Sequence, residues 1–263
     1  MILKLVRLKD WYQYIFICSI YFFIFNKMLS AVYLISLIFL LAGIYMLNDF
    51  FDLEVDLIKP QGDYKALQFR KNNRVLIRGI FTGLLGISLL GFFFISLDKF
   101  ITAFLIILIM FLYSHHKILL KSRPFVDLFC IFLTYKLIIF SSFDAINLKS
   151  ILLSSFIGLM AMDAHILQSV RDIECDSKYN IRTIASYLGE GRSFLFFKIA
   201  AILTAIYMSI GLYKLFGSSY YIYIPMLLLP VVFERCKNPE VVWGHFKILS
   251  GIIICFIILG LVK

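Results

Sequence analysis

Long uncharged stretches alternate with short polar segments along the whole chain. Between Lys27 and Asp49, for example, no charged residue occurs. Because a transmembrane helix needs roughly 20 consecutive apolar residues, such runs favour membrane spans over buried core helices. The pattern predicts nine spans, over residues 11–26, 31–50, 76–97, 100–119, 125–143, 150–171, 193–213, 218–234 and 245–262. Two prolines, Pro225 and Pro230, interrupt the eighth span, which membrane helices tolerate.

The composition agrees with this pattern. The chain has 263 residues, of which 62% are hydrophobic, and its mean hydropathy is +0.92. We therefore expect an all-α integral membrane protein, a bundle of about nine transmembrane helices that forms a single domain over residues 1–263. The five cysteines are scattered without a CxxC pair, which indicates neither a disulfide framework nor a thiolate metal site.

The net charge of +10 is explained by the distribution of basic residues between the two sides of the membrane. If the N-terminus is cytoplasmic, the N-terminal tail and the loops after spans two, four, six and eight hold 20 of the 26 Lys and Arg residues. The opposite side holds 5, and Lys136 lies inside span five. This asymmetry predicts a multi-pass protein of the cytoplasmic membrane, if bacterial, with its N-terminus inside. Anionic membrane lipids, and no nucleic acid, are the expected partners of the basic surface.

Two acidic stretches close even-numbered spans on the predicted cytoplasmic side. The first, "NDFFDLEVD", places Asn48, Asp52 and Asp56 at i, i+4 and i+8. The second places Asp172 and Asp176 at i and i+4, with Gln168 one turn before Asp172. On a helix, each set lines one face with oxygen ligands. A carboxylate deep in a bilayer costs roughly 2.5–3.5 kcal/mol, so several on one face indicate a partner that neutralises them.

Mg²⁺ is the cation that this chemistry favours, because it binds a few carboxylates together with waters and substrate phosphates. Two acidic helix ends could thus hold Mg²⁺ on a diphosphate, with nearby basic residues balancing the remaining charge. The alternative is that these are solvated helix ends with no ligand. Two such motifs at equivalent helix ends favour the binding site.

The same residues resemble the UbiA superfamily of intramembrane prenyltransferases. "NDFFDLEVD" fits the pattern NDxxDxxxD, "RDIECD" is similar to the second Asp-rich motif, and "YSHHK" fits the YxxxK element. The resemblance implies helices around a central cavity that opens to the cytoplasmic side. It also implies a Mg²⁺ cofactor, a polyprenyl diphosphate donor and transfer of the prenyl group to a lipophilic acceptor in the membrane.

The chain departs from the family pattern at Gln168, where Asn or Asp is usual. Glutamine still offers a carbonyl oxygen, so the second motif is expected to bind the metal more weakly or through water. The stretches "LKSRPFVD" and "HILQSVRDIECDSKYNIRTIASYLG" resemble the branch of lycopene elongases and related carotenoid enzymes. Members with other acceptors share much of these stretches.

The resemblance and the residue chemistry together give the predicted site. The predicted metal ligands are Asn48, Asp49, Asp52, Asp56, Gln168, Asp172 and Asp176. The predicted diphosphate-binding residues are Lys117, Lys121, Arg123, Lys59, Arg171, Lys178 and Arg182. The predicted catalytic residues are Asp52, Asp172, Lys117 and Tyr113, and the possible cavity residues are Lys136 and His165.

Two other functions are compatible with intramembrane carboxylates. One is transfer of a different diphosphate-activated group, such as phosphoribosyl, in the same type of cavity. The other is ion-coupled transport, but transporters place such groups near the bilayer midplane on broken helices. Here both acidic motifs lie at helix ends on one side, which favours the enzyme.

The predicted orientation can be tested with cysteines at positions 61 and 147 in a chain without native thiols. An impermeant thiol reagent added to intact cells should label position 147 and leave position 61 unlabelled, because only the former loop is expected outside. Labelling at 61 with protection at 147 would reverse the orientation.

Overall fold

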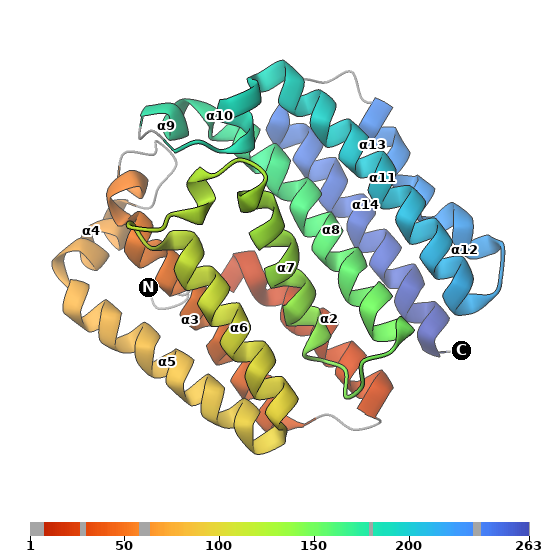
Figure 1. Cartoon of the computed structure of the whole chain (residues 1–263), viewed down its shortest axis with the longest axis horizontal. Coiled ribbons are helices and arrows are strands. Elements are labelled where there is room, and N and C mark those ends of the chain that lie inside the picture. Colours follow the sequence, from red (N-terminus) through yellow and green to blue (C-terminus); the bar gives the residue numbers. More distant parts are fainter. Residues whose placement is uncertain (1–7, 27–29, 58–63, 179–180, 234–237, 263) are drawn as a thin grey trace. The chain divides into compact units, whose positions relative to one another are not determined.

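A computed structural model of the chain describes residues 8–26, 30–57, 64–178, 181–233 and 238–262. Every regular element in these residues is a helix (Figure 1), which confirms the expected all-α class. The helices form two compact units. Unit 1 comprises residues 1–120 and 137–144, and unit 2 comprises residues 121–136 and 145–263. The single domain over residues 1–263 stays a prediction.

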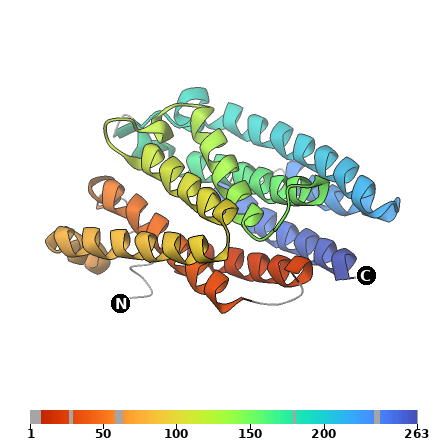
Figure 2. The ribbon, with the colours of Figure 1, turned by 60° about the horizontal axis from the view of Figure 1, so that its bottom comes forward.

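Unit 1 is built on one long central helix. Its helices are α2 (Leu8–Asn26), α3 (Ala31–Asp56), α4 (Tyr64–Asn72), α5 (Arg74–Ile95) and α6 (Leu97–Ser114). Helix α3 packs along α5 and α6, as Figures 1 and 2 show. A Cβ at Gly91 would collide with the Ser36 hydroxyl, and one at Gly43 would press on Leu85. Small residues therefore let α3 and α5 approach closely, as is typical of membrane helix pairs.

Unit 2 is built around α8 (Leu148–Arg171), which packs against α11 (Glu190–Phe216) and α14 (Pro239–Val262). These three long helices lie side by side in Figures 1 and 2. Most of α7 (Val126–Phe140) also belongs to this unit. A Cβ at Gly158 of α8 would lie 2.7 Å from the Phe132 carbonyl oxygen of α7, so only glycine permits this close packing.

Six helices among the described residues are long and apolar enough to cross a membrane: α3, α5, α6, α8, α11 and α14. They correspond to predicted spans two, three, four, six, seven and nine. The predicted eighth span is divided into α12 (Tyr220–Tyr223), the 3-10 helix η2 (Ile224–Leu228) and α13 (Leu229–Phe233), as expected around two prolines. The total of nine spans stays a prediction.

Several helix ends differ from the predicted ones. Helix α3 continues to Asp56, past the predicted end at residue 50, so the first acidic stretch is fully helical. Helix α6 ends at Ser114 rather than 119, because His115 leaves the helical region with ψ of 125°. The predicted helical face of the second motif is interrupted: α8 ends at Arg171, and Asp172 separates it from α9 (Ile173–Lys178).

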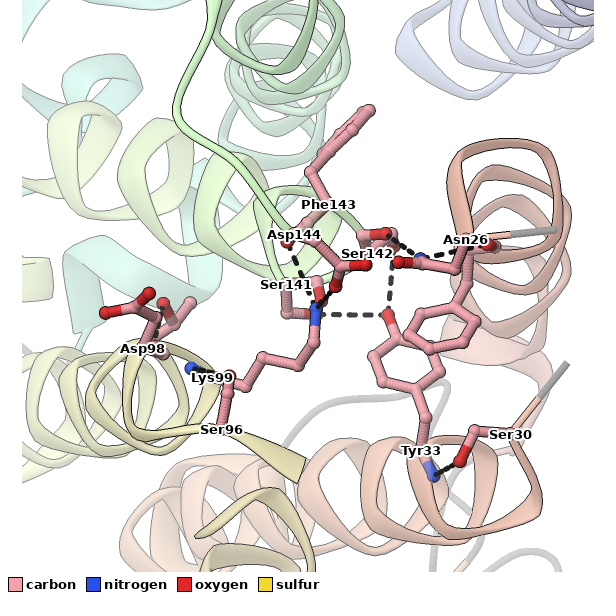
Figure 3. Close-up of polar contacts among 12 residues, drawn as sticks. Asn26, Ser30, Tyr33, Ser96, Asp98, Lys99, Ser141, Ser142, Phe143 and Asp144 are labelled. Carbon is pink, nitrogen blue, oxygen red and sulfur yellow. Dashed lines mark hydrogen bonds and ion pairs between the residues drawn. The ribbon is translucent and has the colours of Figure 1, made fainter. Parts of the chain in front are cut away.

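The start of α6 carries a buried lysine at the end of unit 1 that is remote from the acidic stretch, and the lysine pairs with an exposed aspartate. Lys99 is only 4% exposed and points toward the chain that follows α7 (Figure 3). Its ammonium donates to the Ser141 and Phe143 carbonyl oxygens, both at 3.1 Å, and lies 2.9 Å from the Asp144 carboxylate. The three donors of the ammonium are thus matched by three acceptors.

Side chains from α2 and α3 complete this cluster. The Tyr33 hydroxyl lies 3.1 Å from the Ser141 hydroxyl and 2.9 Å from that of Ser142. Asn26 donates to the Ser142 carbonyl oxygen (Figure 3), and Lys99 also lies 5.9 Å from the centre of the Tyr33 ring. The segment after α7 is therefore held to α2, α3 and α6 by buried polar contacts rather than by apolar packing alone.

We expect Lys99→Met to destabilise the protein by about 2–4 kcal/mol, because two buried carbonyl oxygens lose their donor and Asp144 loses its partner. Thermal unfolding of the purified protein in detergent measures the loss. Lys149→Met is the matched control, since Lys149 is exposed, and it should unfold at nearly the wild-type temperature. Equal unfolding temperatures for the two variants would contradict the assigned role of Lys99.

Candidate functional site

The first acidic site consists of Asn48, Asp49, Asp52 and Asp56 at the end of α3. The Asn48 amide group donates to an Asp52 carboxylate oxygen at 3.1 Å, one helical turn away. The Asn48 carbonyl oxygen accepts from the Ser114 hydroxyl at 2.7 Å, at the last residue of α6. Asn48 therefore orients Asp52 and joins it to α6.

Asp49 has a different environment. It is 1% exposed, and its carboxylate lies 2.7 Å from the Arg70 guanidinium of α4, which is itself 8% exposed. Such a buried pair is far more sensitive to the loss of one partner than a surface pair is. Nearby, Arg74 and Glu54 approach at 3.7 Å but are 51% and 80% exposed, so this second pair contributes little.

The two phenylalanines of the motif point to other neighbours. Phe50 contacts the ring of Phe81 on α5, and Arg74 lies 5.8 Å from the Phe50 ring centre. Phe51 packs against the rings of Phe111 and His115 at the end of α6. Four consecutive residues thus have four separate sets of partners, which fixes the end of α3 against α4, α5 and α6.

The YxxxK element lies next to this site within unit 1. Tyr113 is 7% exposed in the last turn of α6, beside the Ser114 that binds Asn48. Lys117 follows in the turn after α6 and is exposed. Leu119 has φ of 46°, and Phe125 on the far side of this loop has φ of 66°. Because non-glycine residues rarely adopt this left-handed region, the loop between α6 and α7 is held under strain.

The second acidic site consists of Gln168, Asp172 and Asp176 in unit 2. Asp172 receives two contacts from the guanidinium of Arg171, with Nε at 2.9 Å and Nη2 at 3.2 Å. The same guanidinium lies 5.8 Å from the ring centre of Trp243 on α14, within the range of a cation–π contact. Lys247 lies 3.9 Å from that ring as well. Two cations therefore flank one indole next to Asp172.

A histidine connects this site to the start of α7. His165 Nε2 lies 3.0 Å from both oxygens of Asp127, whose side chain is fully buried. The side chains of Gln168 and Asp176 lie close enough to His165 to interact with it electrostatically. Because Asp127 fixes the ring orientation of His165, this pair joins the start of α7 to the part of α8 that carries Gln168.

The remaining predicted residues occupy varied positions. Arg123, Lys178 and Arg182 are exposed, whereas Lys121 is 8% exposed in the 3-10 helix η1 (Leu120–Ser122). Lys136 lies on α7 with its ammonium 5.6 Å from the Phe132 ring centre. Lys59 lies outside the described residues. The assignment of the predicted residues to metal, diphosphate or cavity stays a prediction.

Sequence reasoning missed several residues that hold the two sites. Ser114 lies inside the motif "YSHHK", and Asp127 ends the stretch "LKSRPFVD". Both residues therefore belong to recognisable stretches, but the sequence alone does not indicate that they hold the sites. Arg70 was one of many basic residues in the second loop, and its burial had no signal in the sequence. Trp243, one of two tryptophans, lies far along the chain from the acidic motif that it adjoins.

The ligand chemistry of both sites suits Mg²⁺. Asp52, Asp56 and Asp172 are half-buried, so their carboxylates stay within reach of solvent. Among the described residues, no three His, Cys, Asp or Glu side chains gather into a metal site. Mg²⁺ usually takes only one or two carboxylates and completes its octahedron with waters and substrate phosphates. Few hard oxygen ligands in each site therefore fit this ion.

The chain belongs to the UbiA prenyltransferase family, whose model matches residues 16–238. Because six helices in the described part of the chain are long and apolar enough to span a membrane, it is a multi-pass integral membrane protein. No curated protein matches its sequence. The family match confirms the resemblance that the acidic motifs indicated.

Solved structures of low sequence identity share the fold. A UbiA homologue from Archaeoglobus fulgidus bound to DMAPP and Mg²⁺ has 18% identity and a TM-score of 0.72, with 97% of this chain and 96% of that chain covered. A digeranylgeranylglyceryl phosphate synthase has 22% identity and a TM-score of 0.72, covering 99% and 97%. The apo UbiA homologue from Aeropyrum pernix K1 has 14% identity and a TM-score of 0.71, covering 94% and 97%.

The Asp127–His165 contact gives a prediction about unit 2. His165→Leu should lower the unfolding midpoint by about 5–10 °C, because it removes the contact between His165 and the fully buried Asp127 carboxylate, although protonation of Asp127 limits the loss. His165→Gln, which can still donate a hydrogen bond, is the conservative control and should lose less. Thermal unfolding in detergent measures both, and similar midpoints for His165→Leu and wild type would contradict the prediction.

Proposed function

We propose that this protein is a Mg²⁺-dependent prenyltransferase. It transfers a prenyl group from a polyprenyl diphosphate to a lipophilic acceptor within the membrane. Family membership and the presence of DMAPP or GPP with Mg²⁺ in two homologues of the same fold support this proposal. The reaction is proposed to take place on the cytoplasmic side, where the positive-inside count puts the acidic helix ends.

The observation that carries the proposal is the arrangement of the first acidic site. Asp52 lies at the end of a membrane-spanning helix, is half-buried and is oriented by Asn48, which is in turn held by Ser114. A carboxylate that is already oriented and still within reach of solvent can take a hard cation such as Mg²⁺ as a ligand. A metal–diphosphate complex supplies such a cation, and a lipid-soluble donor carries it to the membrane.

The residues have separate proposed roles. Asn48, Asp52 and Asp56 of unit 1 would act as Mg²⁺ ligands. Asp172 and Asp176 of unit 2 are also proposed as Mg²⁺ ligands, with Gln168 as a weaker or water-mediated ligand. When bound, Mg²⁺ supplies positive charge that stabilises the departing diphosphate.

Lys117 and Arg171 are each proposed to interact with the diphosphate. Lys117 lies in the turn after α6 in unit 1. It is proposed to donate to the bridging oxygen of the prenyl diphosphate as the allylic C–O bond breaks. Arg171, which lies against Asp172, would share its charge between that carboxylate and the diphosphate. An electron-rich carbon of the acceptor then attacks the allylic cation and loses a proton.

The test uses the purified protein in lipid nanodiscs with a radiolabelled prenyl diphosphate and a membrane lipid extract as the acceptor pool. Wild type should release diphosphate and give a prenylated lipid, identified by mass, only with Mg²⁺. Asp52→Asn and Asp172→Asn should lose nearly all turnover. Lys117→Met should lose about 10²–10³ in rate, which is typical for one lost transition-state donor.

The matched control for Lys117 is Lys71→Met, because Lys71 is an exposed lysine of the second loop and should keep near-normal activity. Full turnover in EDTA, or a fully active Asp172→Asn enzyme, would falsify the metal-dependent mechanism. Binding of phosphoribosyl diphosphate in place of any prenyl diphosphate would favour transfer of that group instead. Ion uptake into proteoliposomes without prenyl transfer would favour the transporter.

A further inference from the structure

The four polar residues of the first acidic site share one stripe of α3 but have different neighbours. At roughly 100° per residue, Asn48 and Asp49 form the two edges of the stripe, and Asp52 and Asp56 lie between them. The edge at Asn48 is held by Ser114 of α6, and the edge at Asp49 is held by Arg70 of α4. The two central carboxylates are half-buried, whereas Asp49 is 1% exposed.

Helix α4 is attached to the end of α3 through one face. Leu67 and Arg70 are three residues apart, lie on the same face of α4 and are 5% and 8% exposed. Lys71, one residue further, is exposed. At its end, the Asn73 amide donates to the Phe69 carbonyl oxygen at 2.9 Å, which caps α4 at the start of α5. Arg70 therefore makes the ionic contact through which this short polar helix docks on α3.

We propose that Asp49 is a positioning residue that anchors α4 through Arg70, and that it does not ligate the metal. Its carboxylate is dry and lies 2.7 Å from a buried guanidinium, which already neutralises the charge that a metal would neutralise. The pair holds α4 against the end of α3 that carries Asp52 and Asp56. The effect of this anchoring on metal binding rests on the proposed function, whereas the anchoring of α4 itself does not.

Hydrogen exchange of the backbone amides of residues 67–72 measures the anchor without any activity assay. Asp49→Asn and Arg70→Gln should each speed exchange in this segment by about tenfold or more, because either change removes the buried ion pair between α3 and α4. Arg74→Gln is the matched control, since its pair with Glu54 is exposed, and it should leave exchange unchanged. The reciprocal exchange, Asp49→Arg with Arg70→Asp, should restore protection.

Mn²⁺ binding, followed by electron paramagnetic resonance with a non-reactive prenyl thiodiphosphate, tests the second half of the proposal. Asp52→Asn should lose most Mn²⁺ affinity. Any loss in Asp49→Asn should be matched by an equal loss in Arg70→Gln, because both act through α4. If Arg70→Gln does not fold, Arg70→Lys, which keeps the charge, should keep both protection and Mn²⁺ binding.

The outcomes separate this proposal from the proposed function. Unchanged exchange of residues 67–72 in both Asp49→Asn and Arg70→Gln would overturn the anchor. Loss of Mn²⁺ affinity in Asp49→Asn alone, to the level of Asp52→Asn, would make Asp49 a ligand and would also overturn it. If wild type binds neither Mn²⁺ nor the thiodiphosphate, the proposed function fails, and the exchange data still decide whether Asp49 anchors α4.

Discussion

An ionised side chain inside or beside a membrane must have a partner, because the surrounding hydrocarbon offers none. This chain meets that condition in two ways within unit 1. At one end of α6, the Lys99 ammonium is bound by two carbonyl oxygens and Asp144, so its positive charge is compensated within the protein. At the other end, the stripe on α3 has its edges matched by Ser114 and Arg70, while its central carboxylates stay half-buried. The lysine at one end is thus buried, whereas Asp52 and Asp56 at the other end stay within reach of solvent.

The second acidic site uses the same physical principle with other residues. Arg171 lies against Asp172, and the indole of Trp243 packs on that guanidinium from α14. Asp127 is paired with His165, which lies three residues before Gln168 on α8. The glutamine, where the family usually has Asn or Asp, therefore lies within one turn of a histidine whose ring orientation is fixed.

Close approach and backbone strain accompany the packing of these helices. Glycines at positions 43, 91 and 158 let helices pack at distances that a side chain would prevent. Two non-glycine residues in the left-handed region, Leu119 and Phe125, bracket the basic loop between α6 and α7. Such residues persist only where the surrounding structure holds them. The conformation at these two positions is therefore imposed by the surrounding structure rather than preferred by the residues themselves.

The sequence by itself determined the helical membrane class, the positions of the long apolar helices and the two acidic stretches. Hydrophobic runs and carboxylate spacing are local properties, and they can therefore be recognised from the sequence alone. Only the tertiary structure decided that α3 continues through the first motif and that α8 stops before Asp172, since each end depends on contacts with distant segments. It also decided the partners of the charges. Asp49 and Asp52 look alike in the sequence, but a basic residue from the second loop buries one of them and leaves the other half-exposed. Burial of that kind depends on how α4 docks on α3, and local sequence carries no signal for it.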